Sequence, residues 1–505
     1  MIFAVSCKRF SCYFCNVMFF QITIICILLY FGLLVATSFF VSRKQNNNNA
    51  FFSANKQAKW YMVAFGMLSA SISGVSLVSV TGMVQTFHFS YLQTVIGFFF
   101  GYLVVAFLLL PFFYKNNGVT IYGYLEKRFD CWTHKTGSMF FIVAKLVSAA
   151  TKLHISVLVL HQFINTFYDV SFITILAIVL LFIWLYTFRG GILSIVWTDC
   201  IQTFFLILST ILILLAVIKT LDFDCNEIFS SLKNSSLSKV FIFDDFHSKQ
   251  NFFKQFFSGI FIVIVMTGLD QDMMQKNLSC KTLKDSQKNM VSYGIMFLPI
   301  NFIFLLLGFL LIILAQKEQL TIPFGDELLP FFAFNYFGKF IALCFLIGII
   351  AASFSSADSA LTAITTSISV DILNIKKNSK SEVLNRKLIH LGVFLIFFFI
   401  ILLFSKIESK NILDLIYTIV AYLYGPLLGL FGFGIFTKHK VKGVKVSILC
   451  LFSPIICFII NLVSKHIWNY TFGYELLLFN GLITFVGLYI FSLNADGNKK
   501  CRICN

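Results

Sequence analysis

Residues 351–361 read AASFSSADSAL and continue an apolar run that begins at Phe340. On a helix, one alanine and three serines of this segment share a face at positions i, i+3, i+4 and i+7: Ala352, Ser355, Ser356 and Ser359. Hydroxyl oxygens are hard ligands that suit cations such as Na⁺. Asp358 lies beside that face, and a buried carboxylate should hold a cation or a proton. The alternative, in which the hydroxyls bond back to their own helix, leaves Asp358 unexplained.

The composition of the whole chain places this segment in a membrane. Of its 505 residues, 58% are hydrophobic and 12% are charged, whereas roughly 25% are charged in an average soluble domain. This indicates an all-α polytopic membrane protein surrounded by the lipid bilayer, and it excludes intrinsic disorder. The net charge of +17 is attributed to basic residues in short cytoplasmic loops, so no nucleic-acid partner is expected.

Apolar runs long enough to span a bilayer recur along the chain. A spanning helix needs about 20 such residues, and by this criterion we expect about 13 transmembrane helices. Their centres lie near Ile25, Ser71, Phe100, Val147, Leu180, Phe205, Ile262, Leu305, Leu346, Leu395, Ile419, Ile455 and Ile483. The segments between them are too short for a catalytic domain. The chain also lacks the GxxxxGKS or GxxxxGKT loop that would bind ATP.

Loop charges predict the orientation of the chain. Basic residues follow alternate expected spans, in the clusters 43–56, 115–135, 276–288, 376–387 and 438–445. Because cytoplasmic loops carry the excess of Lys and Arg, we expect the N-terminus outside and the C-terminus inside a bacterial inner membrane. Residues 1–17 are expected to be an N-terminal extension, and Met18 is our hypothesis for the true start. Residues 18–493 would form the transmembrane domain and residues 494–505 a cytoplasmic tail.

Two further polar clusters interrupt apolar spans. Residues 69–76 read SASISGVS, and serine and glycine favour local alternatives to the helix. A helix unwound here would expose carbonyls that can bind a cation, although a small-residue stripe for close helix packing is equally open. Residues 189–202 read RGGILSIVWTDCIQ, in which the glycine pair permits a tight turn. Asp199 and Gln202 then enter the membrane on one face, unless Asp199 lies at the interface, bonded to a neighbouring loop.

A fourth segment follows the seventh expected span. Residues 267–278 read TGLDQDMMQKNL, and three lysines follow within ten residues. This pattern predicts a polar amphipathic helix on the cytoplasmic side. From the residues alone, a solvated face is the expectation for its charged side chains.

Together these segments resemble the sodium/solute symporter family, which includes sodium–sugar, proline, pantothenate and sialic-acid symporters. The resemblance spans roughly residues 22–493 and rests on motifs in the family's order: YGYLEKRF (122–129), GG…WTD..Q (190–202), G.DQ…Q..L (268–278) and SSADS.L (355–361). It implies a LeuT-like fold with two inverted repeats of five helices, here about 58–220 and 251–437. It also implies sodium-coupled symport that imports a small organic solute by alternating access. Na⁺ would be the coupling ion, with no other cofactor and no obligate protein partner.

The resemblance further implies the family's sodium site between the first and eighth core helices. Its ligands would be the backbone carbonyls of Ser69, Ile72 and Ala352 and the hydroxyls of Ser355 and Ser356. Asp199 matches an aspartate that family members place on the sodium release path or in a second sodium site. We hypothesise that a second cation is held by Asp199, Ser355, Asp358 and Ser359. Alternatively, Asp358 carries a proton.

The solute is expected beside the unwound segment, near Ser73, Gly74 and Ser76. Ser76 stands where sugar symporters have a sugar-reading glutamine, and Ser71 stands where proline symporters have an aspartate. Neither a galactose-type nor a proline-type site is therefore reproduced, and the solute stays open. A sensor, or a proton-coupled or uncoupled transporter, is the alternative on the same fold. An enzyme is not expected, because the intramembrane histidines have no carboxylate partner on their helix.

Overall fold

The computed structural model describes residues 2–43, 48–116, 118, 120–375, 380–406, 412–441, 443–468, 470 and 472–500. The helices up to residue 234 are α1 (Ile2–Ser42), α2 (Asn48–Ser53), α3 (Trp60–Ser71), α4 (Gly74–Phe87), α5 (Tyr91–Val104), α6 (Leu110–Asn116), α7 (Gly123–Arg128), α8 (Cys131–Asn165), α9 (Phe172–Leu221) and α10 (Cys225–Asn234). Those that follow are α11 (Phe252–Val263), α12 (Gln271–Leu278), α13 (Leu283–Lys317), α14 (Leu328–Asn335), α15 (Lys339–Ser367), α16 (Lys380–Phe404), α17 (Ile412–Phe436), α18 (Val444–Trp468) and α19 (Leu476–Lys500). Short 3₁₀ or π-helical turns are η1 (Ala54–Lys56), η2 (His88–Ser90), η3 (Val105–Leu109), η4 (Ser236–Ser238), η5 (Ile264–Gly268), η6 (Gly325–Glu327) and η7 (Ile368–Ile372).

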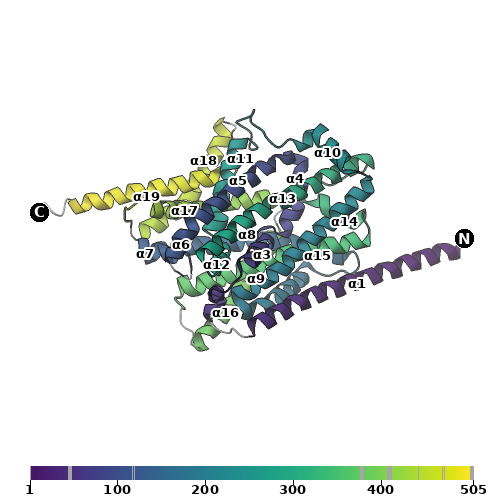
Figure 1. The fold of residues 1–505 in the computed structure, drawn as a ribbon, viewed down its shortest axis with the longest axis horizontal. Helices are drawn as coiled ribbons and strands as arrows, with labels where there is room; N and C mark the ends of the chain where they lie inside the picture. Colours follow the sequence, from purple (N-terminus) through teal and green to yellow (C-terminus); the bar gives the residue numbers. More distant parts are fainter. Residues whose placement is uncertain are drawn as a thin grey trace.

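The helices pack side by side into one bundle, and α1 and α19 extend from it toward opposite ends (Figure 1). Among the described residues, nine helical segments are long and apolar enough to cross a membrane, and a bent pair makes a tenth. Two shorter apolar helices add to these, Phe172–Phe188 and Leu476–Ser492. Every one of the expected span centres falls within a helix. The prediction of an all-α polytopic membrane protein is confirmed, while the number thirteen stays a prediction.

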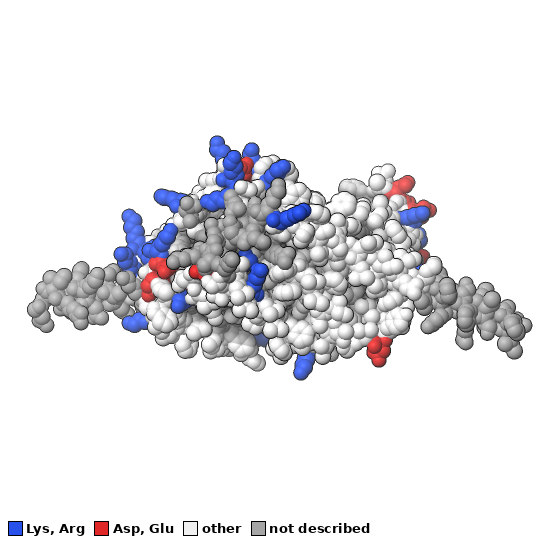
Figure 2. All heavy atoms as spheres, turned by 90° about the horizontal axis from the view of Figure 1, so that it is seen from below, with Lys and Arg blue, Asp and Glu red and all other residues white. Residues whose placement is uncertain are grey.

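Lipid-facing and central helices differ in burial. In the most apolar windows of the spans Ser381–Phe404 and Val444–Trp468, only 28% and 22% of residues are buried inside the protein. Their outer faces expose side chains such as Leu395, Phe399 and Ile455. Figure 2 shows a broad surface without charged side chains, and most of the Lys and Arg side chains in this view gather toward one end. Such a surface is suited to hydrocarbon rather than water.

Helix α15 lies at the centre of the bundle. In the most apolar window of its span, 83% of residues are buried, and every residue from Gly348 to Ser367 is buried. It packs most extensively against α9, and also against α8 and α3. A helix that is buried all round needs small residues wherever a neighbour approaches closely. The alanines and serines of residues 351–360 meet this requirement and carry polar groups into the core.

The first helix of each expected repeat is broken. Helix α3 ends at Ser71, and Ile72 (φ −81°, ψ 88°) and Ser73 (φ −80°, ψ 170°) leave the helical region before α4 begins. In the second repeat, α11 continues through η5 and meets α12 at a bend of 65°. The predicted unwinding within residues 69–76 is therefore confirmed, and it has a counterpart in α11 and α12.

Close packing also shapes the first break. A Cβ at Gly74 would lie 2.5 Å from the Ser353 Oγ and 2.9 Å from the Ile349 carbonyl oxygen of α15. Only glycine lets the start of α4 approach α15 this closely. Unwinding and small-residue packing therefore operate together in this segment.

The glycine pair before Asp199 forms the expected turn. Gly191 has φ 60° and ψ −156° within α9, a conformation that is essentially restricted to glycine. A Cβ at this residue would lie 2.3 Å from the Phe51 Cα of α2. Gly191 therefore redirects the chain so that the second half of α9 enters the core beside α15.

We predict that Gly191→Ala destabilises the protein. The backbone conformation alone should cost roughly 1–3 kcal/mol, and the contact with α2 adds to it. The midpoint of thermal unfolding in detergent should fall clearly. Gly392→Ala in α16 is the matched control, because a Cβ there meets no atom of the described residues within 4 Å. An equal midpoint for the two variants would contradict this account of the turn.

Candidate functional site

The hydroxyl of Ser356 faces the end of α3. Its Oγ lies 2.9 Å from the Ala70 carbonyl oxygen and 3.4 Å from that of Ser69. It also lies 3.3 Å from the Ala352 carbonyl oxygen on its own helix. The break after Ser71 leaves these α3 carbonyls without the next helical turn, so they point toward α15. One hydroxyl and three carbonyl oxygens thus converge between the first and eighth core helices.

The hydroxyl of Ser355 continues this cluster toward α9. Its Oγ donates to Asp199 Oδ1 at 2.5 Å and lies 2.8 Å from the Ser69 Oγ. The Ser69 hydroxyl also lies 3.1 Å from the Asp199 carbonyl oxygen. Asp199 is fully buried, which fits a place inside the core rather than at the membrane interface. Helices α3, α9 and α15 therefore meet at one oxygen-rich point.

These oxygens fit a small hard cation. Carbonyl and hydroxyl oxygens are the ligands that such ions prefer, and Asp199 supplies a negative charge nearby. The structure brings together five of the predicted site residues: Ser69, Ala352, Ser355, Ser356 and Asp199. Ile72 lies in the adjacent break.

Asp358 and Ser359 lie on other sides of α15. Asp358 accepts a hydrogen bond at 2.9 Å from the hydroxyl of Tyr186, in the first half of α9. Ser359 accepts one at 2.7 Å from the ammonium of Lys276 in α12. Of the four residues of the hypothetical second site, Asp199 and Ser359 are therefore joined through Lys276 and Ser355 contacts Asp199, whereas Asp358 is held separately by Tyr186.

The structure corrects the expectation for the segment after η5. Residues 271–278 form the predicted helix, α12, but its polar side chains are buried rather than solvated. The physical reason is that each finds a partner in the core. Gln275 donates at 2.6 Å to the Phe52 carbonyl oxygen, and Asn277 accepts at 2.7 Å from Asn289. Lys276 Nζ lies 2.8 Å from Asp199 Oδ2.

Two lysines of α8 were missed by the sequence reasoning. Lys145 Nζ lies 3.1 Å from Asp270 Oδ2 and 2.8 Å from Asp272 Oδ2. Lys152 follows seven residues later, on the same face of the helix. The sequence does contain an indication of their role. Two lysines spaced i, i+7 inside an apolar span are energetically unfavourable unless they serve a function.

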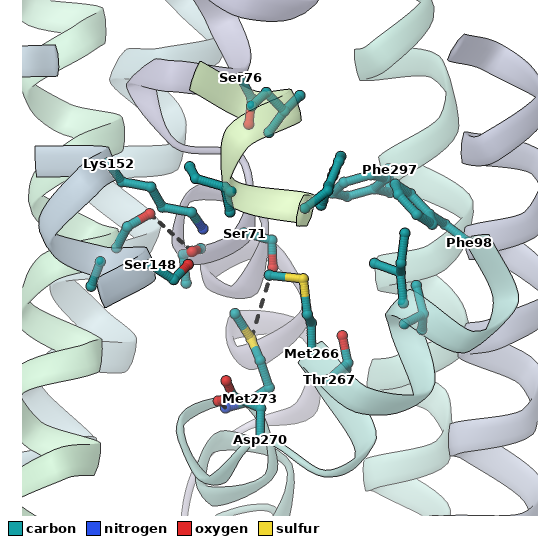
Figure 3. A pocket seen from close by; sticks show the side chains of 18 of the residues that line it. Ser71, Ser76, Phe98, Ser148, Lys152, Met266, Thr267, Asp270, Met273 and Phe297 are labelled. Atoms are coloured by element: carbon teal, nitrogen blue, oxygen red, sulfur yellow. Dashed lines mark hydrogen bonds between the residues drawn. The ribbon is translucent and has the colours of Figure 1, made fainter. Parts of the chain in front are cut away.

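A cavity opens beside the break in α3 (Figure 3). Its cavity volume is about 70 Å³. Polar wall residues include Ser71, Ser76, Ser148, Lys145, Lys152, Thr267, Asp270 and Asn301, and apolar ones include Phe98, Met266 and Phe297. Of the expected solute residues, Ser76 lines the cavity. Ser73 and Gly74 adjoin the cavity wall in the chain, and the Ser73 hydroxyl is buried with no hydrogen-bond partner among the described residues.

Two broken helices, a cluster of hydroxyl and carbonyl oxygens between them and an adjacent cavity are the features of a cation-coupled secondary transporter of LeuT-like fold. The chain belongs to the sodium:solute symporter family, whose model matches residues 51–443. It is a sodium-coupled symporter of a small solute, and Na⁺ is its coupling ion.

Individual relatives agree with this placement. The chain is 25% identical to the sodium/sialic acid symporter NanT of Aliivibrio fischeri over 83% of this chain and 85% of that protein. It is 24% identical to the sodium/sialic acid symporter SiaT of Proteus mirabilis, over 84% and 87% of the two chains. A solved outward-open structure of a Na⁺-coupled sialic acid symporter superposes with a TM-score of 0.79 at 20% identity, covering 93% of this chain and 97% of that one.

We predict that Ser356→Ala weakens sodium binding. A hydrogen-bonding partner of a charged group contributes roughly 1.5–3 kcal/mol, so the half-saturating NaCl concentration should rise roughly tenfold or more. The check is thermal stability in detergent, titrated with NaCl against KCl at constant ionic strength. Ligand binding raises stability as RT ln(1 + [L]/Kd). The exposed Ser405→Ala is the control, and equal sodium responses in both variants would contradict the assignment.

Proposed function

We propose that this chain imports a small organic anion together with Na⁺ through a bacterial inner membrane. The N-terminus would lie outside and the C-terminus in the cytoplasm, and transport would involve no covalent chemistry. The observation that supports an anionic solute is the ammonium of Lys152, which lies in the cavity beside the α3 break.

The charges around the cavity support this choice. Lys145 has two carboxylate partners, Asp270 and Asp272, within 3.1 Å. Among the described side chains, no carboxylate lies within 4 Å of the Lys152 ammonium. Lys152 is half-buried in the cavity wall, where a charge without a partner is unfavourable. A carboxylate on the solute would supply the missing partner, and the anion sialic acid is what the named relatives carry.

The rest of the cavity suits a polyhydroxylated solute. The hydroxyls of Ser71, Ser76 and Ser148 line one part of it, and Tyr293 donates to Ser71 at 2.6 Å. The aromatic rings of Phe98 and Phe297 line the opposite side (Figure 3). Sites of this kind combine apolar walls with a few polar groups that fix orientation. We place the solute against these hydroxyls, beside the segment from Ser73 to Ser76.

Sodium binding supplies the coupling. The proposed ligands are the carbonyls of Ser69, Ile72 and Ala352 and the hydroxyls of Ser355 and Ser356. A cation there would tie α3 to α15 and stabilise one arrangement of the two repeats. Differential stabilisation of this kind is what shifts a conformational equilibrium. Release of Na⁺ would pass Asp199, and Asp199, Ser355, Asp358 and Ser359 would hold a second positive charge.

We predict that Lys152→Met weakens binding of anionic solutes more than tenfold, because loss of one partner of a buried charge pair is strongly unfavourable. Lys152→Arg should retain most of the affinity. The check is uptake into proteoliposomes driven by a sodium gradient, with sialic acid, acetate and neutral glucose as probes. Lys233→Met, at an exposed lysine of α10, is the control. Uptake of glucose without uptake of any carboxylate would contradict an anionic solute.

A further inference from the structure

Lys276 occupies an unusual position for a lysine. Its side chain is only 1% exposed, and α12 holds it in the centre of the bundle. The ammonium nitrogen lies 2.8 Å from Asp199 Oδ2 and 2.7 Å from the Ser359 Oγ. Asp272 Oδ1 lies 3.8 Å away on the other side. The ammonium is thus surrounded by oxygen atoms from α9, α12 and α15.

The same oxygens belong to the hypothetical second cation site. Asp199 and Ser359 contact the ammonium directly, and Ser355 contacts the other oxygen of the Asp199 carboxylate at 2.5 Å. An ammonium has three donors and no acceptor, so oxygens arranged for a metal cation also suit it. The distances are those of charge-assisted hydrogen bonds.

We propose that the ammonium of Lys276 is a built-in cation that fills the second cation position, so that this symporter binds a single Na⁺. The inference rests on the proposed sodium site at Ser355 and Ser356. A second Na⁺ at Asp199 would have to displace the ammonium and leave it buried beside Asp272 at 3.8 Å. Separation of a buried pair leaves an uncompensated charge, which is strongly unfavourable. The lysine therefore supplies its positive charge in every cycle without leaving the protein.

The position of Lys276 also gives it a role that a free ion lacks. Asp272, its second neighbour, is paired with Lys145, whose other partner Asp270 lines the solute cavity. A chain of ion pairs thus connects the cavity with Asp199 at the proposed sodium site. Its intermediate members are Lys145, Asp272 and Lys276. A fixed ammonium maintains this chain of ion pairs whether or not Na⁺ is bound.

The test is equilibrium binding of radioactive Na⁺ to the purified full-length protein in detergent. Wild type should bind one Na⁺ per chain at saturation. In Lys276→Met, Asp199 loses its partner and its oxygens become available to a metal ion, so the binding capacity should rise to two. Adding Asp199→Asn to Lys276→Met should return the capacity to one. Lys233→Met makes the same substitution at an exposed lysine and should leave the capacity unchanged.

The outcomes separate this inference from the proposed function. No sodium binding by wild type, or no loss in Ser356→Ala, would overturn the proposed sodium site itself. Two Na⁺ per wild-type chain would leave sodium coupling in place and overturn the built-in cation. One Na⁺ in both wild type and Lys276→Met would also overturn it, because no site would have been released. Should Lys276→Met fail to fold, the wild-type capacity still decides between one ion and two.

Discussion

The ion pair between Asp199 and Lys276 is the contact on which the core arrangement depends. Both side chains are about 1% exposed, and their charged atoms lie 2.8 Å apart. A charge at this depth requires a partner and further hydrogen bonds, and both conditions are met by elements far apart in the sequence. Ser355 binds the free oxygen of Asp199, and Ser359 binds the ammonium. The pair thus fixes α9, α12 and α15 relative to one another at the site where α3 breaks.

The need to bring these buried groups together also accounts for the two broken helices. A continuous α3 would satisfy its own carbonyls and offer none to a cation. The break at Ile72 and Ser73 releases carbonyls toward Ser356, while the bend between α11 and α12 brings Lys276 into the core. The two repeats therefore meet at one electrostatic centre, with the proposed sodium ligands on one side and the cavity beside α3 on the other. A change of charge at this centre affects both, which is the physical requirement for coupling.

Much of this arrangement could be read from the sequence, and the exceptions share a cause. Hydropathy located the helices, since apolar runs of sufficient length have few other structures available in lipid. The serines of residues 351–361 and 69–76 predicted a group of oxygen atoms at this point, because buried hydroxyls inside an apolar helix require hydrogen-bond or cation partners, and the structure brings Ser69, Ser355 and Ser356 together. From the residues alone, a solvated face was expected for the charged side chains of the α12 segment, because only tertiary packing supplies the partners that bury them. Lys145 and Lys152 were readable from their spacing, but the pairing of Lys145 with Asp270 joins residues 125 positions apart.

A built-in cation changes the energy that the proposed cycle can use. If one Na⁺ and one monovalent anion move together, no net charge crosses the membrane and the membrane potential adds nothing. A second Na⁺ would add about 2.3 kcal/mol for each 100 mV of inward-negative potential. With a single Na⁺, a tenfold sodium gradient, about 1.4 kcal/mol, sustains at most a tenfold gradient of solute. Under this proposal, Lys276 would lower the limit of accumulation and make it independent of the membrane potential. The buried carboxylate of Asp199 would keep the positive partner that its position in the core requires.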